Sequence, residues 1–493
     1  MRIQFEEHGP NHVTSSSSSS SSSIQLLHQQ LLPPTYKVVR LMKRPNGEIQ
    51  PNVDLVVLEE STRPLLDQFI KHHQEQHGGG NNTSPSTPLL LLVKRIYLSL
   101  DPAMRGWMND IPSYIPPVKL KSVMRGTTIC QVVGVTGGGG SGGGGIAGGN
   151  SNQRRHPNSL FFHVGDYIVD GNLNGGWDEY AVVNGNYCRK INPSPTNPSS
   201  SNISLPITCH LSVLGMTGMT AYFGLLHTVT PPPKSGDTVL VSAAAGATGS
   251  LVCQIAKHVL GCKVIGIAGG TTKCQYLLND LQCCDSVIDY KQTRDDPNGF
   301  QKQLKMALIS INSKGIDIYF DNVGGYILNE TFRRLHIGGR IIVCGGISNY
   351  NAAGSQRGDD IKFPPTNYMS LIPLRATMKG FIVLDYKSQF GKARKDITEW
   401  IQQGKIRYIP DDIKTLADGE GGGDAAGGGG LANAPYHLQQ LFHGTNIGKL
   451  IVQIGTPIPS SLSSSLTAAA TAEEDVYNED YKASTTTNLR SRL

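Results

Sequence analysis

Short apolar runs alternate with helical stretches between residues 238 and 346, and this alternation constrains the fold more than any other feature of the chain. The apolar runs are TVLVSA, KVIGIAG, SVIDY, IDIYFDNVG and RIIVCGG, with KGFIVLD closing the series. We expect helices between them at residues 249–260, 272–281, 301–309 and 326–335. Apolar strands that alternate with helices are typical of a parallel sheet covered on both faces. The pattern therefore predicts a doubly wound α/β domain.

The first of these strands leads into the turn VSAAAGATGS, residues 241–250. Ala243, Gly246 and Gly249 occupy the three positions at which dinucleotide-binding turns carry glycine, so two of the three glycines are present. Gly246 would let the backbone approach a pyrophosphate, and Gly249 would let the helix pack closely on its strand. Small residues also occur in such turns for packing alone. The position of this turn between a strand and a helix of a βαβ unit favours a cofactor site, with the helix N-terminus facing the phosphates.

The end of the second strand indicates which nicotinamide cofactor is used. Sites for NAD usually carry an acidic residue there, which binds the adenosine ribose. The sequence here is IGIAGGTTK, which contains no acid and ends in Lys273. A lysine at this point can neutralise a 2′-phosphate, so we predict NADP(H). The alternative is that Lys273 is a solvated residue at the start of a helix.

The first part of the chain has the spacing of a β-rich domain. Its apolar runs are short and are separated by Gly, Pro and Asp: TYKVVRLM, LLLLVKRIYLSL, TTICQVVGV and DYIVDG. An amphipathic helix at residues 393–403 and a last apolar run, GKLIVQIG, are assigned to the same domain. The α/β domain, residues 205–384, is then inserted between residues 35–204 and residues 385–456.

Several segments are too rich in Gly, Ser or other polar residues to bury a core, and we predict them to be disordered. They are the N-terminal residues 1–34, the inserts near residues 74–88, 137–157 and 418–432, and the tail at residues 457–493. The rest of the chain is long enough for two domains of ordinary size.

Composition excludes several classes of function. The net charge of +6 over 493 residues is small and spread along the chain, which argues against a nucleic-acid partner. No apolar run has the length of a membrane span, and no signal-peptide pattern opens the chain. The nine cysteines are an odd number and lie in apolar segments. We therefore expect reduced thiols, no membrane and a cytoplasmic location.

Taken together, these motifs resemble those of the medium-chain dehydrogenase/reductase superfamily, and in particular its zinc-free alkene reductases. This branch comprises the prostaglandin reductases, the plant alkenal reductases and the bacterial curcumin-reductase-like proteins. The stretches that carry the resemblance occur in the family's order between residues 36 and 454: LSLDPAMRGWM, SYIPPVKL, GGWDEYAVV, LGMTGMTAYFGLL, SAAAGATGS, IDYK, YFDNVGG, CGGISNYN, GFIV and HGTNIGKLIVQI. The resemblance implies a GroES-like β-rich catalytic domain with an inserted Rossmann domain that binds NADP(H).

The resemblance also implies which residues line the cofactor groove. Met216 and Thr220 would contact the nicotinamide half, and Lys273 and Tyr290 the 2′-phosphate. The remaining groove residues would be Asn322, Cys344, Ser348, Tyr350, Phe381, Val383 and Asn446. Some of them have a plainer alternative, because Phe381 and Val383 have the spacing of core residues, Asn322 that of a turn residue, and Cys344 that of a buried strand cysteine.

Zinc enzymes of the same superfamily hold their metal through Cys and His ligands. This chain has neither four closely spaced cysteines nor a Gly-His-Glu stretch. Cys209 and His210 are the only adjacent Cys/His pair, and adjacent side chains seldom point at one metal. We expect no zinc site.

Without a Lewis acid, reduction of a polarised C=C bond is easier than oxidation of an alcohol. Hydride would go to the β-carbon of an enal or enone, and hydrogen-bond donors would stabilise the charge that develops on the carbonyl oxygen. The resemblance implies Tyr350 as the side-chain donor or proton relay, with the nicotinamide ribose hydroxyl as a second donor. Alternatively, Tyr350 only packs on the cofactor. We predict an NADPH-dependent reductase of α,β-unsaturated aldehydes and ketones.

One departure from the family concerns the substrate pocket. The plant alkenal and mammalian prostaglandin enzymes carry a tyrosine inside the DP-x-MR stretch, where this chain has Ala103. The curcumin-reductase-like branch tolerates alanine there. Trp107 and Tyr114 would then form the pocket wall, unless they are packing residues. Two rival functions stay open, a quinone reductase with the same cofactor site and a non-catalytic NADPH-binding scaffold.

Two further expectations concern assembly and location. A homodimer is the commonest arrangement of such proteins, and we expect one here. The C-terminal Ser491-Arg492-Leu493 resembles the Ser-Lys-Leu peroxisomal address. Import into peroxisomes is therefore the alternative to a cytoplasmic location.

Overall fold

The computed structural model describes residues 32–77, 88–136, 162–171, 175–192, 205–293, 296–352, 364–408, 412–416 and 430–459. Most of the segments predicted to be disordered lie outside these residues, as does the C-terminal Ser491-Arg492-Leu493. Among the residues described, no helix combines the length and apolar character needed to cross a membrane.

A six-stranded sheet in which all neighbouring strands are parallel forms one half of the molecule. Its strand order is β10-β9-β8-β11-β12-β13, which is that of a doubly wound dinucleotide-binding sheet. The order reverses between β8 and β11, and the predicted α/β fold is confirmed. The strands are β8 (Thr238–Val241), β9 (Lys263–Ala268), β10 (Ser286–Asp289), β11 (Ile316–Asp321), β12 (Leu335–Val343) and β13 (Thr377–Gly380).

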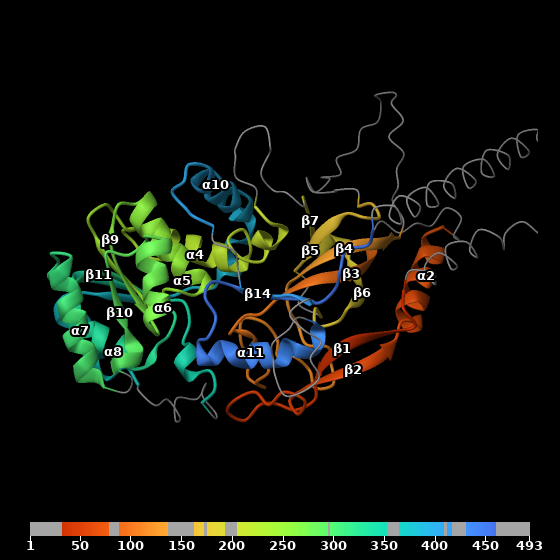
Figure 1. The fold of residues 1–493 in the computed structure, drawn as a ribbon, viewed down its shortest axis with the longest axis horizontal. Coiled ribbons are helices and arrows are strands. Elements are labelled where there is room, and N and C mark those ends of the chain that lie inside the picture. The colour runs from red at the N-terminus through yellow and green to blue at the C-terminus, as the bar shows by residue number, and fades with distance from the viewer. Residues whose placement is uncertain are drawn as a thin grey trace, which may run out of the picture.

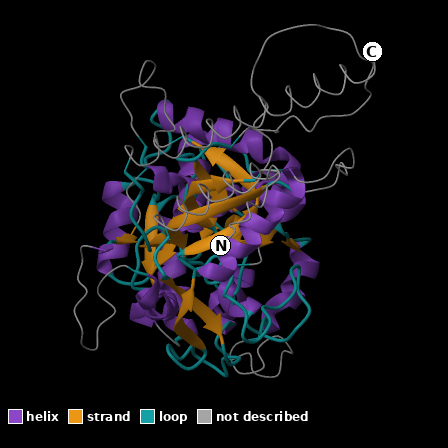
Figure 2. Cartoon of the chain, turned by 90° about the vertical axis from the view of Figure 1, so that its right-hand side faces the viewer, coloured by secondary structure: helices purple, strands orange, loops and turns teal. Residues whose placement is uncertain are grey.

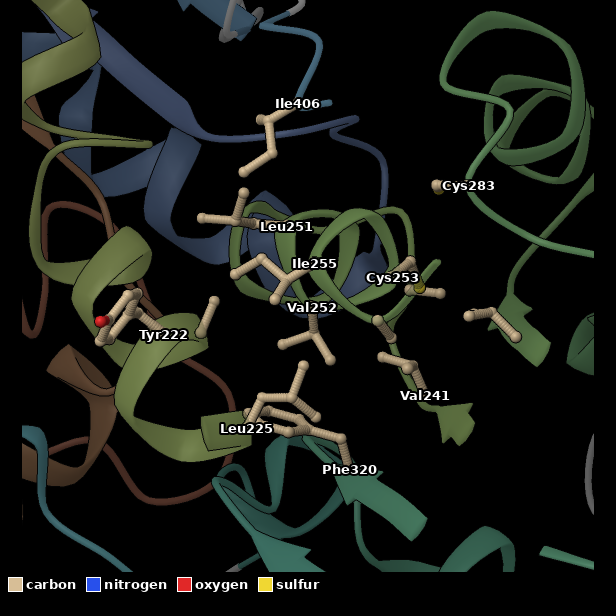
Figure 3. Close-up of a cluster of buried hydrophobic side chains, with 14 of the residues drawn as sticks. Tyr222, Leu225, Val241, Leu251, Val252, Cys253, Ile255, Cys283, Phe320 and Ile406 are labelled. Atoms are coloured by element: carbon tan, nitrogen blue, oxygen red, sulfur yellow. The ribbon is translucent and has the colours of Figure 1, made fainter. Parts of the chain in front are cut away.

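Helices cover both faces of this sheet (Figure 1). The strands direct alternate side chains to opposite faces, with Val239 and Val241 in one apolar cluster and Leu240 in another. The helices on the first face are α4 (Met216–His227), α5 (Ala247–Gln254), α6 (Thr271–Gln275) and α10 (Phe390–Gln402); α5 and α6 continue into the π-helical segments Ile255–Val259 and Tyr276–Asp280. The second face carries α7 (Pro297–Ser310) and α8 (Gly325–Thr331). Figure 3 shows the first face, where Leu225 of α4, Val252 of α5 and Phe320 of β11 point toward one another.

Two predictions made for the region after β12 are wrong. The run KGFIVLD was expected to be a strand, but β13 ends at Gly380 and a 3-10 helix follows at Val383–Gln389. The strand ends because Phe381 turns inward and packs edge-on against Phe320, with ring centroids 6.5 Å apart. Helix α10 was assigned to the β-rich domain, but its apolar face packs into the cluster under the parallel sheet. This helix therefore belongs with the sheet that precedes it.

A second half of the molecule is built from β-sheets, and we call it the β-rich half. Its seven-stranded sheet has the order β14-β15-β3-β4-β5-β7, with β6 paired to β3. The strands are β3 (Leu90–Ser99), β4 (Thr128–Val135), β5 (Tyr167–Asp170), β6 (Tyr180–Asn184), β7 (Cys188–Ile191), β14 (Asp412–Lys414) and β15 (Leu450–Gln453). The GKLIVQIG run forms β15, which pairs antiparallel with β3. The chain thus returns to the β-rich half after the parallel sheet, as predicted.

The remaining elements of the β-rich half close its core. They are the antiparallel pair β1 (Thr35–Leu41) and β2 (Leu55–Ser61), and the helices α2 (Arg63–His77), α3 (Met104–Trp107) and α11 (Ala434–His443). Helix α11 and strand β15 share one buried cluster with β1 and β3. In Figure 2 the strands run through the interior and helices lie outside them.

Candidate active site

A cavity of about 700 Å³ lies between the carboxyl edge of the parallel sheet and the β-rich half. The turns after β8, β9, β11 and β12 line it on one side, and residues such as Leu100, Trp107 and Leu450 line it on the other. In open α/β sheets, ligands bind at the carboxyl edge where the strand order reverses. This cavity, which we call the cofactor cavity, occupies that position.

The turn after β8 has the form of a phosphate cradle. A Cβ atom on Gly249 would lie 2.3 Å from the Ala243 carbonyl oxygen, so the packing of α5 requires glycine there. A Cβ atom on Gly246 would meet only that same oxygen, at 3.3 Å. Packing within the protein thus leaves Gly246 open toward the cavity. The first N–H groups of α5, which have no acceptor within the helix, border the same space.

A backbone contact joins this turn to the β-rich half. The Gly448 N–H donates to the Ala245 carbonyl at 2.9 Å, and Gly246 and Gly448 form a parallel bridge. Asn446 lines the cavity in the same loop, where its side-chain amide donates to the Gly448 carbonyl at 2.9 Å. The predicted role of Asn446 thus includes shaping the loop that closes on the turn.

The end of β9 forms a cationic site. Lys273 and Tyr290 both line the cavity, and a Cβ atom on Gly444 would lie 4.0 Å from the lysine Nζ and 3.8 Å from the phenol oxygen. The pKa of Lys273 is lowered to about 8, first by burial and then by the charge of Lys291, while Asp412 opposes the shift more weakly. Lysines 273 and 291 beside a phenol suit a doubly charged anion such as a 2′-phosphate.

Asp289, the last residue of β10, binds backbone N–H groups next to this site. The Gly270 N–H donates to Asp289 Oδ1 at 2.7 Å, and the Lys291 N–H donates to the same oxygen at 3.1 Å. Asp289 therefore organises the loop instead of offering its carboxylate to a ribose. Sequence reasoning missed Lys291, although it directly follows Tyr290 in the IDYK stretch.

The residues predicted to contact the nicotinamide half line the cavity, and some of them also pack against the core. Met216 and Thr220 at the start of α4 line the cavity, and the Thr220 hydroxyl donates to the Met216 carbonyl at 2.8 Å. Phe381 and Val383 line it as well, while also packing against the buried cluster of the first face. For these two residues both alternatives hold, because one side of each side chain meets the core and another borders the cavity.

Asn322 ties together the two strands at the point where the strand order reverses. Its side-chain amide donates to the Ser242 carbonyl at 2.7 Å, and its backbone N–H donates to the Ser242 hydroxyl at 2.9 Å. Asp321 beside it accepts from the Ser242 hydroxyl at 3.1 Å and from the Gly324 N–H at 2.9 Å. Asn322 thus lines the cavity and also fixes a turn. The buried Asp321 was missed, because nothing local in the sequence shows that its carboxylate points into the fold.

Tyr350 lies in the loop after β12 and lines the cavity. The Gly346 N–H donates to the phenol oxygen at 3.2 Å, which leaves the hydroxyl proton for another acceptor. Burial raises the pKa of Tyr350, so the phenol is protonated at neutral pH. The Ser348 hydroxyl donates to the Val323 carbonyl at 2.6 Å and holds the loop in place. Burial raises the pKa of the Cys344 thiol in the same wall to about 12, so this thiol is not a nucleophile.

Two aromatic residues of the β-rich half line the cavity, Trp107 and the exposed Tyr114. The Trp107 indole N–H donates to the Tyr114 hydroxyl at 3.1 Å, and both side chains line the cavity beside Ala103. Tyr114 is close enough to Tyr350 to affect the pKa of the latter. The structure therefore places Trp107, Tyr114 and Tyr350 in the lining of one cavity, and the role of Trp107 and Tyr114 as a substrate-pocket wall stays a prediction.

An ion pair in the cavity wall was not predicted. Lys449 Nζ lies 2.6 Å from Asp101 Oδ1, and the lysine side chain is only 3% exposed. Both residues line the cavity. A lysine next to the apolar run of a buried strand is the signal that would have revealed it.

The Cys/His pair considered for zinc lies away from the cavity. Cys209 and His210 are buried, and burial followed by the charges of Arg189 and Arg394 lowers the pKa of His210 to about 3. Among the described residues, the one group of three or more side chains with metal-ligand spacing is formed by cysteines 253, 283 and 284, and none of them lines the cavity.

Comparison with known proteins identifies the family. A family model described as an N-terminal domain of oxidoreductase matches residues 82–148, and one described as a zinc-binding dehydrogenase matches residues 247–399. The chain is 34% identical over 365 residues to the NADPH-dependent curcumin reductase of Escherichia coli, covering 74% of this chain and 87% of that protein. The same values describe its similarity to the NADP(+)-dependent 2-alkenal reductase of Nicotiana tabacum.

A solved structure agrees with these relatives. The structure of CurA in complex with NADPH from Vibrio vulnificus aligns with 85% of this chain and 100% of its own, with a TM-score of 0.60 and 32% sequence identity. The chain therefore belongs to the zinc-free alkene reductase branch of the medium-chain dehydrogenase/reductase superfamily.

Proposed function

We propose that this protein is an NADPH-dependent reductase of the C=C bond of α,β-unsaturated aldehydes and ketones. The observation that carries this proposal is that Tyr350 lines the cavity together with Trp107 and Tyr114, while its phenol oxygen accepts from the Gly346 N–H and its own proton stays available to an acceptor. Relatives named curcumin reductase, 2-alkenal reductase and prostaglandin reductase support the same chemistry.

Different residues of the cavity have different roles in this reaction. Bound NADPH supplies a hydride, which the β-carbon of the substrate accepts. The Tyr350 hydroxyl donates a hydrogen bond to the carbonyl oxygen, where negative charge develops. Trp107 and Tyr114 form a wall that holds the substrate over the reacting face and excludes water. Residues 246–249 and Lys273 hold the phosphates at the other end of the cavity.

NADPH consumption over a panel of enals, enones and quinones, with identification of the products, tests this proposal. Saturated carbonyl products support it. Hydroquinones as the sole products would assign the protein to quinone reduction instead. Normal NADPH binding without turnover of any acceptor would leave only the scaffold function.

Lys273→Ala is expected to weaken NADPH binding about ten- to a hundredfold, because one charge-assisted contact to the 2′-phosphate contributes about 1.5–3 kcal/mol. NADH lacks this phosphate, so its affinity should stay nearly unchanged. Titrations monitored by nicotinamide fluorescence measure both affinities. Lys257→Ala is the control, because Lys257 pairs with Asp285 outside the cavity. Equal weakening of both cofactors would contradict the assignment.

The affinity for NADPH should fall as the pH rises above about 8, the pKa of Lys273. Below this pKa the lysine is already charged and binds the phosphate directly. Above it, binding must include proton uptake, and the dissociation constant should increase by up to about tenfold per pH unit. NADH should show no such slope. In Lys273→Arg the arginine stays charged over this pH range, so the dissociation constant for NADPH should no longer depend on pH. A pH dependence that persists in this variant would exclude Lys273 as its source.

We also propose that two copies of the chain associate through the edge strand β13. All four residues of β13 are exposed, and the strand ends the parallel sheet. Met378 on the strand and Ile372 before it are exposed apolar residues, and an open apolar edge is a template for a second copy. Met378→Lys is expected to convert a dimer to a monomer in light scattering. Met306→Lys on α7 is the control, and a dimer that survives the Met378 change would exclude this interface.

A cytoplasmic location stays a prediction, with import into peroxisomes through Ser491-Arg492-Leu493 as its alternative. A fluorescent protein fused to the N-terminus, with and without deletion of that tripeptide, distinguishes them. Diffuse signal from both fusions supports the cytoplasm, and punctate signal that requires the tripeptide supports import.

A further inference from the structure

Three buried thiols lie together outside the cofactor cavity. They belong to Cys253 on α5 and to Cys283 and Cys284, which follow the π-helical segment after α6, and we call them the thiol cluster. Their Sγ atoms all lie within 4.8 Å of one another, and none of the three is in a disulfide. The side chains are 0%, 0% and 7% exposed, respectively. Figure 3 shows Cys253 and Cys283 at the side of the apolar cluster that α5 forms with the sheet.

Local packing directs two adjacent side chains to the same place. The Cys284 sulfur lies over β9 at Gly266, where a Cβ atom would be only 2.8 Å from it. The Cys283 thiol donates to the Leu277 carbonyl at 3.7 Å. Consecutive residues usually point apart, but here both sulfurs approach Cys253. Metal–thiolate bonds of about 2.3 Å place sulfurs roughly 3.8 Å apart around a shared atom, and the three sulfurs of the thiol cluster lie within 4.8 Å of one another.

The number of ligands limits what this cluster can hold. Within the described residues, no fourth His, Cys, Asp or Glu ligand atom shares the 4.8 Å radius of the three sulfurs. Zinc in protein sites of this kind takes four ligands. A three-coordinate centre therefore fits the cluster better than a tetrahedral one.

The charge balance further limits which ion the thiol cluster can hold. Most neighbours of the cluster are apolar, among them Val264, Leu277 and Leu281. The ionisable residues that act on it are His258, which is exposed, and Asp285, which pairs with Lys257. Three thiolates around a divalent cation would carry a net negative charge into this core, which is costly without a buried cation. Three thiolates around a trivalent centre are neutral. Soft thiolate ligands also select soft centres.

We propose that Cys253, Cys283 and Cys284 form a binding site for trivalent arsenic, which enters as arsenous acid. Three As–S bonds form and three As–O bonds break, and each oxygen leaves as water with the proton of one thiol. Arsenic stays trivalent, the sulfurs are not oxidised, and the product is neutral. The arsenic lone pair occupies the position where a fourth ligand would stand. This site is separate from the cofactor cavity, whose lining contains none of the three cysteines.

The test is native mass spectrometry of the full-length, phosphine-reduced protein mixed with equimolar sodium arsenite. The expected product has gained one arsenic atom and lost three hydrogen atoms, because all three thiols are ligands. A product that retains a hydroxyl on arsenic would show two-thiol binding and overturn the proposal. Absence of any adduct on the folded protein would overturn it as well, as would zinc found at one ion per chain bound to these cysteines.

Two variants make the result specific. Cys253→Ala removes the third sulfur but keeps the adjacent pair, so its adduct is expected to retain a hydroxyl and to be removed by a small competing dithiol. Cys262→Ala is the matched control, because Cys262 is also buried and its thiol instead donates to the Lys234 carbonyl at 3.3 Å. Thermal unfolding confirms that each variant is folded, and Cys284→Ala replaces Cys253→Ala if the latter is not. A three-thiol adduct in either cluster variant would refute the assignment.

Discussion

Gly246→Val is expected to abolish binding of both NADPH and NADH while the protein stays folded. The backbone at Gly246 has φ of −81° and ψ of 170°, which a β-branched residue adopts without strain. A Cβ atom there meets only the Ala243 carbonyl oxygen, at 3.3 Å, so a small shift of the turn accommodates it. The two methyl groups would then project into the cavity, where the pyrophosphate must approach the backbone.

Equilibrium titration with each cofactor measures this effect, with circular dichroism as the check on folding. Gly391→Val is the matched control, because Gly391 is exposed on α10 and a Cβ atom there meets nothing within 4 Å. The control should bind both cofactors normally. A folded Gly246 variant with unchanged affinities would mean that the turn after β8 does not hold the pyrophosphate.

Tyr350→Phe is expected to lower kcat by about a hundredfold and to leave the affinity for NADPH nearly unchanged. Loss of one donor to a developing oxyanion typically costs about 10²–10³ in rate, and the ribose hydroxyl of the cofactor offsets part of that loss. The ring still packs in the loop after β12, which the Ser348–Val323 hydrogen bond continues to hold. Cofactor binding should therefore survive.

Steady-state kinetics with an enone substrate, together with a cofactor titration, separates the two effects. Tyr368→Phe provides the control, because Tyr368 is 54% exposed and does not line the cavity. Full activity of the Tyr350 variant would reduce that residue to a packing role. A parallel loss of cofactor affinity would show instead that the loop had moved.

The sequence predicted the fold well where the signal is local. Largely apolar strands such as β8 and β11, and the helices between them, follow from periodicity over a few residues. The doubly wound arrangement also followed, because connections between parallel strands are right-handed and leave few alternatives. The early end of β13 did not follow, since Phe381 leaves the strand for a contact with Phe320, more than sixty residues earlier in the chain.

In the candidate site, too, features with a local sequence signal could be predicted and contacts between distant residues could not. Residues inside motifs, such as Gly246, Lys273 and Tyr350, could be predicted because each motif has a fixed place at the carboxyl edge of the sheet. The Lys449–Asp101 ion pair and the contacts of Asp321 with Ser242 could not, because each joins residues far apart in sequence. Helix α10 was misassigned for a related reason, since an amphipathic pattern shows that a face is buried but not against which partner.

The hydrogen bond between Gly448 and Ala245 joins the two halves of the molecule at the turn after β8. It connects the loop before β15 to the turn after β8, so residues of both halves form this part of the cavity wall. Trp107 and Tyr114 stand at the other end of the cavity, where they meet the loop of Tyr350. If the two halves move apart while this hydrogen bond stays intact, the cavity opens at these aromatic residues. We therefore expect substrate exchange at these aromatic residues to leave the backbone contact at the turn after β8 intact.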